Sequence, residues 1–203
     1  MRFAAFTLLA TIASAAFSYA APTSPATNAL EARHAGCECH DIQSVIYTAT
    51  TAITPLVQKL LYIRSDNCTT EVLTPVLAEI KVVLTTTIAD VKGLVGYSTT
   101  AILTTINGVV LTVADVAGLV CGLLNLIFGA VYVVLKVVAS VDAAVIKPLL
   151  IEVLKIVAEL LHCILCLIDG LLIALLRIVG GVIIQVIVLL EIKSVFYCFY
   201  TLY

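Results

Sequence analysis

The chain passes without a charge through twenty residues, Val116-Ala-Gly-Leu-Val-Cys-Gly-Leu-Leu-Asn-Leu-Ile-Phe-Gly-Ala-Val-Tyr-Val-Val-Leu135. A helix of this length matches the ~30 Å apolar core of a bilayer, and it equally matches a long buried helix. Small or polar residues recur along the stretch at steps of three and four. These are Gly118, Gly122, Asn125, Gly129, Tyr132 and Lys136. A mean spacing near 3.5 residues predicts a helix–helix seam, centred on Gly118, Gly122, Asn125 and Gly129.

Two similar segments follow, so the last 90 or so residues predict three long helices near 116–138, 143–168 and 170–195. The second segment has a stripe of Glu152, Lys155, Glu159, His162 and Cys166, and the third has one of Gly170, Ala174, Arg177, Gly181 and Gln185. Leu171–Leu190 is a second candidate for crossing a membrane. Leu149–Ile168 is not, because its three charges cancel the gain from its aliphatic residues.

An internal repeat is a further expectation. Aspartates recur at positions 90, 115, 142 and 169, and Ala-Asp-Val-x-Gly-Leu-Val occurs at both 89–95 and 114–120. This pattern predicts a helix-length unit with a turn or a helix cap near each aspartate.

Residues 41–92 have the periodicity of ordinary amphipathic helices. Asp41 is the expected N-cap of the first helix, which Pro55 is expected to kink or split. A turn at Asp66-Asn67 precedes a second helix that ends at Gly93, Gly96 and Ser98. The chain is therefore predicted to be all-α, an antiparallel bundle of about five to six helices, of which the last three are very hydrophobic with narrow polar stripes.

The composition excludes several classes of protein. The 203 residues are 62% hydrophobic and 12% charged, with a net charge of −2 and no basic runs. Such a chain is neither a disordered linker nor a nucleic-acid-binding protein. An ordinary soluble enzyme is disfavoured because few polar residues remain to cover a surface.

The N-terminal segment is typical of exported proteins. Residues 1–20 predict a signal peptide cleaved after Ala20. Residues 21–33 read either as a propeptide processed after Arg33 or as a flexible leader. The remainder divides into an amphipathic part, 34–108, and a highly hydrophobic part, 109–203.

Export favours disulfides over free thiols among the seven cysteines. The candidates for disulfide bonds are Cys37, Cys39, Cys68, Cys163 and Cys166. Because seven is odd, one thiol is left unpaired or bonds between chains, and Cys121 and Cys198 are the candidates. Zinc binding by Cys37-x-Cys39-His40 with His162-Cys163-x-x-Cys166 is the weaker interpretation, so no metal and no cofactor are predicted. Asn67-Cys68-Thr69 is an N-glycosylation sequon.

No motif for catalysis is present. His162 and Cys163 point about 100° apart on a helix, and Lys155 between Glu152 and Glu159 indicates an ion-pair stripe rather than an acid/base pair. No catalytic residue is therefore predicted.

Val182–Leu190 has the composition of a cross-β segment, but a helix is favoured. The aromatic tail, 196–203, suits either an anchor at an interface or a packed cap.

The chain resembles the secreted hydrophobic structural proteins of mushroom-forming fungi, which coat hyphae, support aerial growth and attachment, and substitute for hydrophobins. The resemblance rests on the signal peptide, the Leu30-Glu-Ala-Arg33 leader and the Cys37-x-Cys39 start of the mature chain. It also rests on a moderately hydrophobic half that precedes a very hydrophobic one. Adjacent Cys-Cys pairs and an eighth cysteine, as in hydrophobins proper, are missing.

The leading prediction is a non-enzymatic, secreted protein of the cell wall or cell surface that self-associates or coats apolar interfaces. The first alternative is a small multi-span membrane protein packed through the Gly118/Gly122/Gly129 seam. The second is a lipid-binding helical bundle.

Overall fold

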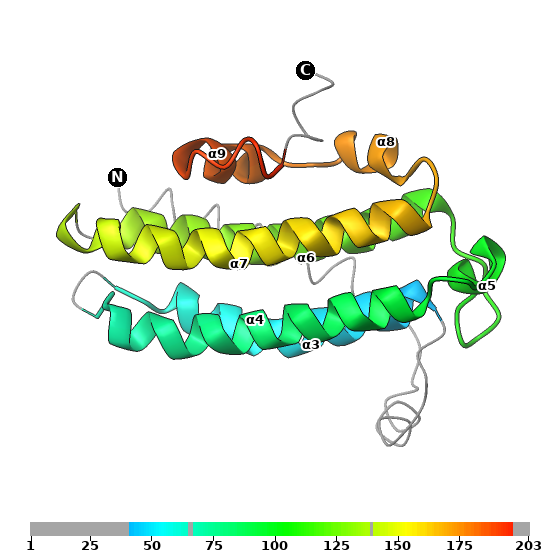
Figure 1. Ribbon diagram of the computed structural model, residues 1–203, viewed down its shortest axis with the longest axis horizontal. Coiled ribbons are helices and arrows are strands. Elements are labelled where there is room, and N and C mark those ends of the chain that lie inside the picture. The colour runs from blue at the N-terminus through cyan, green and yellow to red at the C-terminus, as the bar shows by residue number, and fades with distance from the viewer. Residues whose placement is uncertain (1–40, 65–66, 139, 197–203) are drawn as a thin grey trace.

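The computed structural model describes residues 41–64, 67–138 and 140–196, which form seven helices and one isolated β-bridge. The helices are α3 (Ile42–Leu61), α4 (Thr70–Gly93), α5 (Thr99–Leu103), α6 (Val113–Val137), α7 (Ser140–Leu167), α8 (Leu171–Leu176) and α9 (Gly181–Leu189). They form three layers, with α3 and α4 in the first, α6 and α7 in the second and α8 and α9 in the third (Figure 1). The all-α prediction is confirmed, but the helices outnumber the expected five to six.

The amphipathic part folds much as its sequence predicts. Asp41 caps α3, and its carboxylate accepts the Ser44 backbone N–H at 2.8 Å. Ile42, Val45, Ile46 and their helical repeats line the buried face of α3. Pro55 does not split the helix, because α3 continues through it to Leu61. The second helix, α4, ends at Gly93 as expected.

The most hydrophobic long helix, α6, lies in the middle of the molecule. Thr112 and Asp115 begin it with a capping box, in which each side chain accepts the other's backbone N–H. The helix contacts α3 on one side and α8 and α9 on the other. The stretch that matches a bilayer in length is thus surrounded by other helices of the same chain.

Two ion pairs join α7 to α4, its neighbour in the first layer. Lys81 pairs with Glu152, and Lys92 pairs with Glu159 at 3.1 Å. Since both residue numbers rise together, α4 and α7 run parallel. The antiparallel pairs are those joined in sequence, α3 with α4 and α6 with α7 (Figure 1).

The prediction of a third long helix near 170–195 is wrong. The segment is divided into α8 and α9, so Leu171–Leu190 is not a continuous spanning helix. Gly170 has φ +79° and turns the chain after α7. Residues 177–180 separate α8 from α9, and Gly180 and Gly181 lie where α9 begins. Glycine weakens a helix by about 1 kcal/mol per residue. At the break, the Ile178 carbonyl accepts a hydrogen bond from the Cys121 thiol of α6 at 3.5 Å.

The internal repeat is not a structural repeat. The motif at 89–95 covers the end of α4, whereas the motif at 114–120 lies in the first turns of α6. Asp90 is thus near a helix C-terminus and Asp115 near a helix N-terminus. Asp142 lies inside α7, and only Asp169 follows a helix end as a turn residue. A threonine stands three residues before each of these two aspartates, Asp90 and Asp115, so the local sequence does not decide the difference. Thr87 donates to the Val83 carbonyl within α4, whereas Thr112 accepts the Asp115 N–H at the start of α6.

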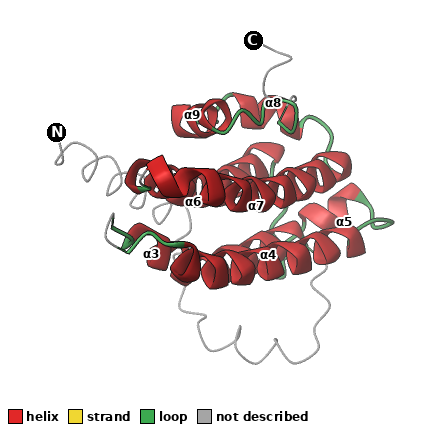
Figure 2. Cartoon of the chain, turned by 60° about the vertical axis from the view of Figure 1, so that its left-hand side comes forward, coloured by secondary structure: helices red, strands yellow, loops and turns green. Residues whose placement is uncertain are grey.

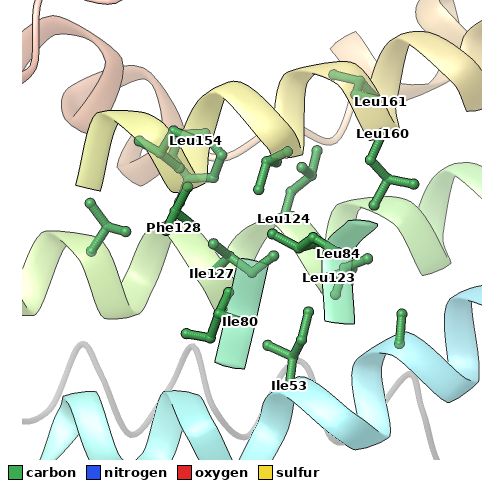
Figure 3. Close-up of a cluster of buried hydrophobic side chains, with 14 of the residues drawn as sticks. Ile53, Ile80, Leu84, Leu123, Leu124, Ile127, Phe128, Leu154, Leu160 and Leu161 are labelled. Carbon is green, nitrogen blue, oxygen red and sulfur yellow. The ribbon is translucent and has the colours of Figure 1, made fainter. Parts of the chain in front are cut away.

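The core lies between the first two layers, where side chains of α3, α4, α6 and α7 converge (Figure 3). Phe128, Leu84 and Leu154 are fully buried there. Contact between α6 and α7 is sparser than between either helix and the first layer. A small apolar cavity of about 10 Å³ lies between them, lined by Val120, Leu123, Leu124, Ile127, Val157, Leu160, Leu161 and Ile164.

Candidate functional site

The outer layer, α8 and α9, exposes large apolar side chains to solvent. Ile173 is 58% exposed and Ile178 is 45% exposed, and Val188 and Leu189 in α9 are similarly open. Arg177 is the one charged residue between Leu171 and Leu190. We call these four aliphatic residues the outer apolar surface.

The outer apolar surface is held in place from below. Leu171 and Leu175 of α8 and Ile183, Val186 and Ile187 of α9 are buried. Beneath the break between the two helices, the Asn125 amide donates to Cys121 Sγ at 3.4 Å. A Cβ on Gly180 would lie 3.7 Å from the Asn125 side-chain oxygen. The inner faces are therefore used for packing, and only the outer faces remain available.

A second apolar surface lies at one end of the bundle, in the connection from α4 to α6. No residue from Gly93 to Ala114 carries a charge. The exposed apolar side chains of this connection are Val95, Tyr97, Ile106, Val109 and Val110, each 45–68% exposed. We call them the apolar end.

The tip of the apolar end is a β-hairpin. Thr104 and Val110 form an antiparallel bridge, and the Leu111 N–H donates to the Leu103 carbonyl at 2.9 Å. The turn is closed by the Gly108 N–H donating to the Thr105 carbonyl at 2.8 Å. Gly108 has φ +76°, the left-handed conformation that a three-residue hairpin loop requires.

Sequence reasoning missed this hairpin, although a signal for it is present. Asn107-Gly108 between apolar residues is the strongest short-range pattern for a hairpin turn. The predicted boundary between the amphipathic part, 34–108, and the highly hydrophobic part, 109–203, instead divides the hairpin after Gly108.

Only some residues of the predicted helix–helix seam along α6 lie against other parts of the chain. Gly129 is buried, and Asn125 faces the α8–α9 break. A Cβ on Gly118 or on Gly122 would meet no atom within 4 Å. These two glycines therefore do not mark a close helix contact within the described chain.

The described cysteines do not form disulfides with one another. Cys163 and Cys166, both disulfide candidates, are free thiols in the structure, as is Cys121. Cys68 is buried beside the turn before α4. Burial raises the pKa of the Cys121 thiol, and the hydrogen bond from Asn125 partly offsets this increase in the pKa. Cys37, Cys39 and Cys198 lie outside the described residues.

Asn67 of the glycosylation sequon is exposed, and its side-chain oxygen accepts the Arg64 backbone N–H at 2.7 Å. The processing sites at Ala20 and Arg33 lie outside the described residues.

Within the described ranges, no group of three His, Cys, Asp or Glu side chains could hold a metal ion. The Cys166 thiol lies 3.7 Å from the His162 imidazole, and both side chains are exposed.

The charged stripe of α7 is exposed but differs from the ion-pair stripe that the sequence predicts. Glu152 and Glu159 bind lysines of α4, not Lys155 of their own helix. The hydrogen bond and the charge of Lys81 hold the pKa of Glu152 below its ordinary value of 4.5. Hydrogen bonds from Thr112 similarly lower the pKa of Asp115.

Acid should weaken the α4–α7 contact. Since the pKa of Glu152 is lowered by folding, its contribution to stability is present above pH 4.5 and is lost as the pH falls through the folded-state pKa. Glu152→Gln is expected to lower the melting temperature slightly at neutral pH and to flatten its fall between about pH 5 and pH 3. Lys81→Gln should have the same effect, and the double variant should lose nothing further. Melting curves across this range test the pairing, and additive losses would contradict it.

Comparison with protein-family models, with characterised proteins and with solved structures finds no match for this chain.

Proposed function

We propose that this chain is a non-enzymatic, secreted protein of the cell wall or cell surface that coats apolar interfaces or associates with further copies of itself. The proposal extends the resemblance to the hydrophobic structural proteins of mushroom-forming fungi. It is carried by one observation, the outer apolar surface on α8 and α9.

The outer apolar surface suits adsorption because its parts are already folded. Its four aliphatic side chains expose on the order of 300 Å² to water, and covering that area is favourable by several kcal/mol at ~25 cal/mol per Å². The inner faces of α8 and α9 are anchored on α6, so adsorption needs no unfolding. Exposed charges such as Lys147, Lys155 and Glu159 on α7 would keep the chain soluble before it adsorbs.

A membrane-spanning protein remains the second candidate because two described helices, α4 and α6, are long and apolar enough to cross a bilayer. The surroundings of α6 favour the secreted protein, since 56% of the most apolar window of this helix is buried by the rest of the chain. A lipid carrier is less well supported. The enclosed cavity between α6 and α7, at about 10 Å³, is far too small for an acyl chain, and the larger hollow of about 480 Å³ beside Leu56 and Val83 is an open surface groove.

The proposal predicts that the purified full chain lowers the surface tension of water without detergent. In the variant Ile173→Ser/Ile178→Ser/Val188→Ser/Leu189→Ser, the rate of adsorption should fall at least tenfold, because most of the energy of covering the outer apolar surface is lost. Pendant-drop tensiometry measures this, and circular dichroism verifies the fold.

The matched control is Val72→Ser/Val82→Ser/Val145→Ser, which removes exposed aliphatic residues elsewhere on the surface. It should adsorb almost as the unmodified chain does. Equal loss in both variants would contradict a role for the outer layer, and recovery of the unmodified chain only in detergent extracts of membranes would favour the spanning alternative.

A further inference from the structure

We propose that the hairpin from Leu103 to Leu111 is a lipid-insertion tip, which places Ile106, Val109 and Val110 among the upper acyl carbons of an uncharged, zwitterionic lipid surface. This inference rests on the proposed function and deepens it, because it names the apolar phase and the element that enters it.

The shape of the apolar end suits insertion. The hairpin protrudes from the end of the bundle beyond the helices (Figure 2). Its root is fixed, since Ile102 is buried and Leu103 and Leu111 pack against the core. Neighbouring residues of a strand point to opposite faces, and Val109 and Val110 are both more than half exposed. Val109 and Val110 are therefore both open to a surrounding phase, although Thr105 beside them is buried.

Backbone hydrogen bonding reduces the cost of entering lipid. Unpaired backbone groups are costly in an apolar phase because no water can bind them. In the hairpin, the N–H groups of Thr105, Gly108 and Leu111 all donate to backbone carbonyls at 2.8–2.9 Å. The Val109 N–H donates to the Thr105 hydroxyl at 3.2 Å.

The charge pattern selects the kind of lipid. The first charges on either side of the connection are Lys92 and Asp115, and each already has a partner within the chain. Lys92 pairs with Glu159, and Asp115 accepts the Thr112 backbone N–H in the capping box. Without a basic cluster the surface gains nothing from anionic headgroups. Insertion should therefore depend on apolar contact and hardly on salt.

The size of the tip disfavours a second copy as its occupant. The three aliphatic side chains expose on the order of 300 Å², well below the ~800 Å² per partner of a stable protein interface. Lipid has no such minimum, because it adapts to whatever part of the hairpin is exposed. Tyr97 lies in the same connection and is 45% exposed, and tyrosine is favoured at the boundary between lipid and water. Asn107 at the turn keeps insertion shallow, since its amide needs hydrogen-bonding partners.

The absence of tryptophan from the sequence allows a direct test. Ile106→Trp in the full chain places a single reporter on the tip, and Val82→Trp places one on an aliphatic position of α4 that is 66% exposed. Each variant is titrated with vesicles of phosphatidylcholine, either unmodified or brominated near the top of the acyl chains. The tip reporter should shift to shorter wavelength and be quenched by the brominated lipid, whereas the α4 reporter should do neither.

Ile106→Asp should weaken partition into phosphatidylcholine vesicles at least tenfold, because a carboxylate must then lose water at the tip. Added phosphatidylserine or salt should change partition less than twofold. Quenching of the α4 reporter alone, or a dependence on anionic lipid, would overturn the proposal. A blue shift that follows protein concentration without quenching would identify a second copy as the occupant instead.

The two proposals fail in distinguishable ways. If the chain lowers surface tension but the tip reporter is not quenched, the lipid-insertion tip is refuted and the surface-active protein stands. If the tip reporter is quenched while the outer-layer variant adsorbs normally, the hairpin inference stands and the role of α8 and α9 is refuted.

Discussion

Replacing Phe128 by alanine is expected to lower the free energy of unfolding by about 3–5 kcal/mol, the usual loss for a fully buried phenylalanine. The side chain is 0% exposed at the centre of α6. Its ring also meets that of Phe196 edge to face, with centroids 5.5 Å apart and an interplanar angle of 74°. Such pairs add about 0.5–1.5 kcal/mol beyond the area they bury. The substitution thus removes core packing and the contact that holds the chain after α9 onto α6.

Urea unfolding followed by circular dichroism measures this loss. Phe128→Leu should retain most of the stability, because it keeps apolar volume while losing the ring contact. Val82→Ala on the exposed side of α4 is the control and should change stability by less than about 0.5 kcal/mol. A loss below about 1 kcal/mol for Phe128→Ala would mean that α6 is not the centre of the core.

Leu161→Ala is expected to cost about 2–5 kcal/mol, towards the upper end of that range. Leu161 is 2% exposed and lines the cavity between α6 and α7. Truncation enlarges a space that already exists, and each Å³ of residual cavity adds about 24 cal/mol to the loss. The two helices are held apart by their contacts with α3 and α4, so they cannot easily move together to close it.

Leu165→Ala, one turn further along α7 at a half-buried position, is the matched control and should cost clearly less. Leu161→Met keeps nearly the same volume and should cost less than about 1.5 kcal/mol. Denaturant unfolding of the three variants gives the order directly. Equal losses at positions 161 and 165 would show that the second layer is packed differently.

Local signals in the sequence predicted the local features of the fold. Asp41 caps α3 and Gly93 ends α4, because a cap or a glycine acts on backbone groups within one helical turn. The helix favoured over 182–190 is present from Val182 to Leu189, within α9. For the candidate site, the sequence indicated only a highly hydrophobic part, 109–203, and not which of its side chains are exposed.

Other features were not predicted correctly, because residues far away in the sequence decide them. The break between α8 and α9 is compensated by Cys121, which is 57 residues away from Ile178. Glu152 and Glu159 have a lysine on their own helix, yet they pair with lysines of α4 about 70 residues earlier. The hairpin at Asn107-Gly108 could have been predicted locally, but its exposure depends on where α5 packs.

The sequence by itself determined an all-helical chain, the caps and ends of its first helices, and the apolar faces, because periodicity and capping act over three or four residues. The tertiary structure alone decided what each apolar face meets. Burial of apolar surface has no direction of its own, so a helix with an uncharged stretch as long as 116–135 is equally suited to lipid and to a protein core. Only the packing of α3, α7, α8 and α9 around it makes this helix the interior and leaves the outer apolar surface and the hairpin in contact with the surroundings.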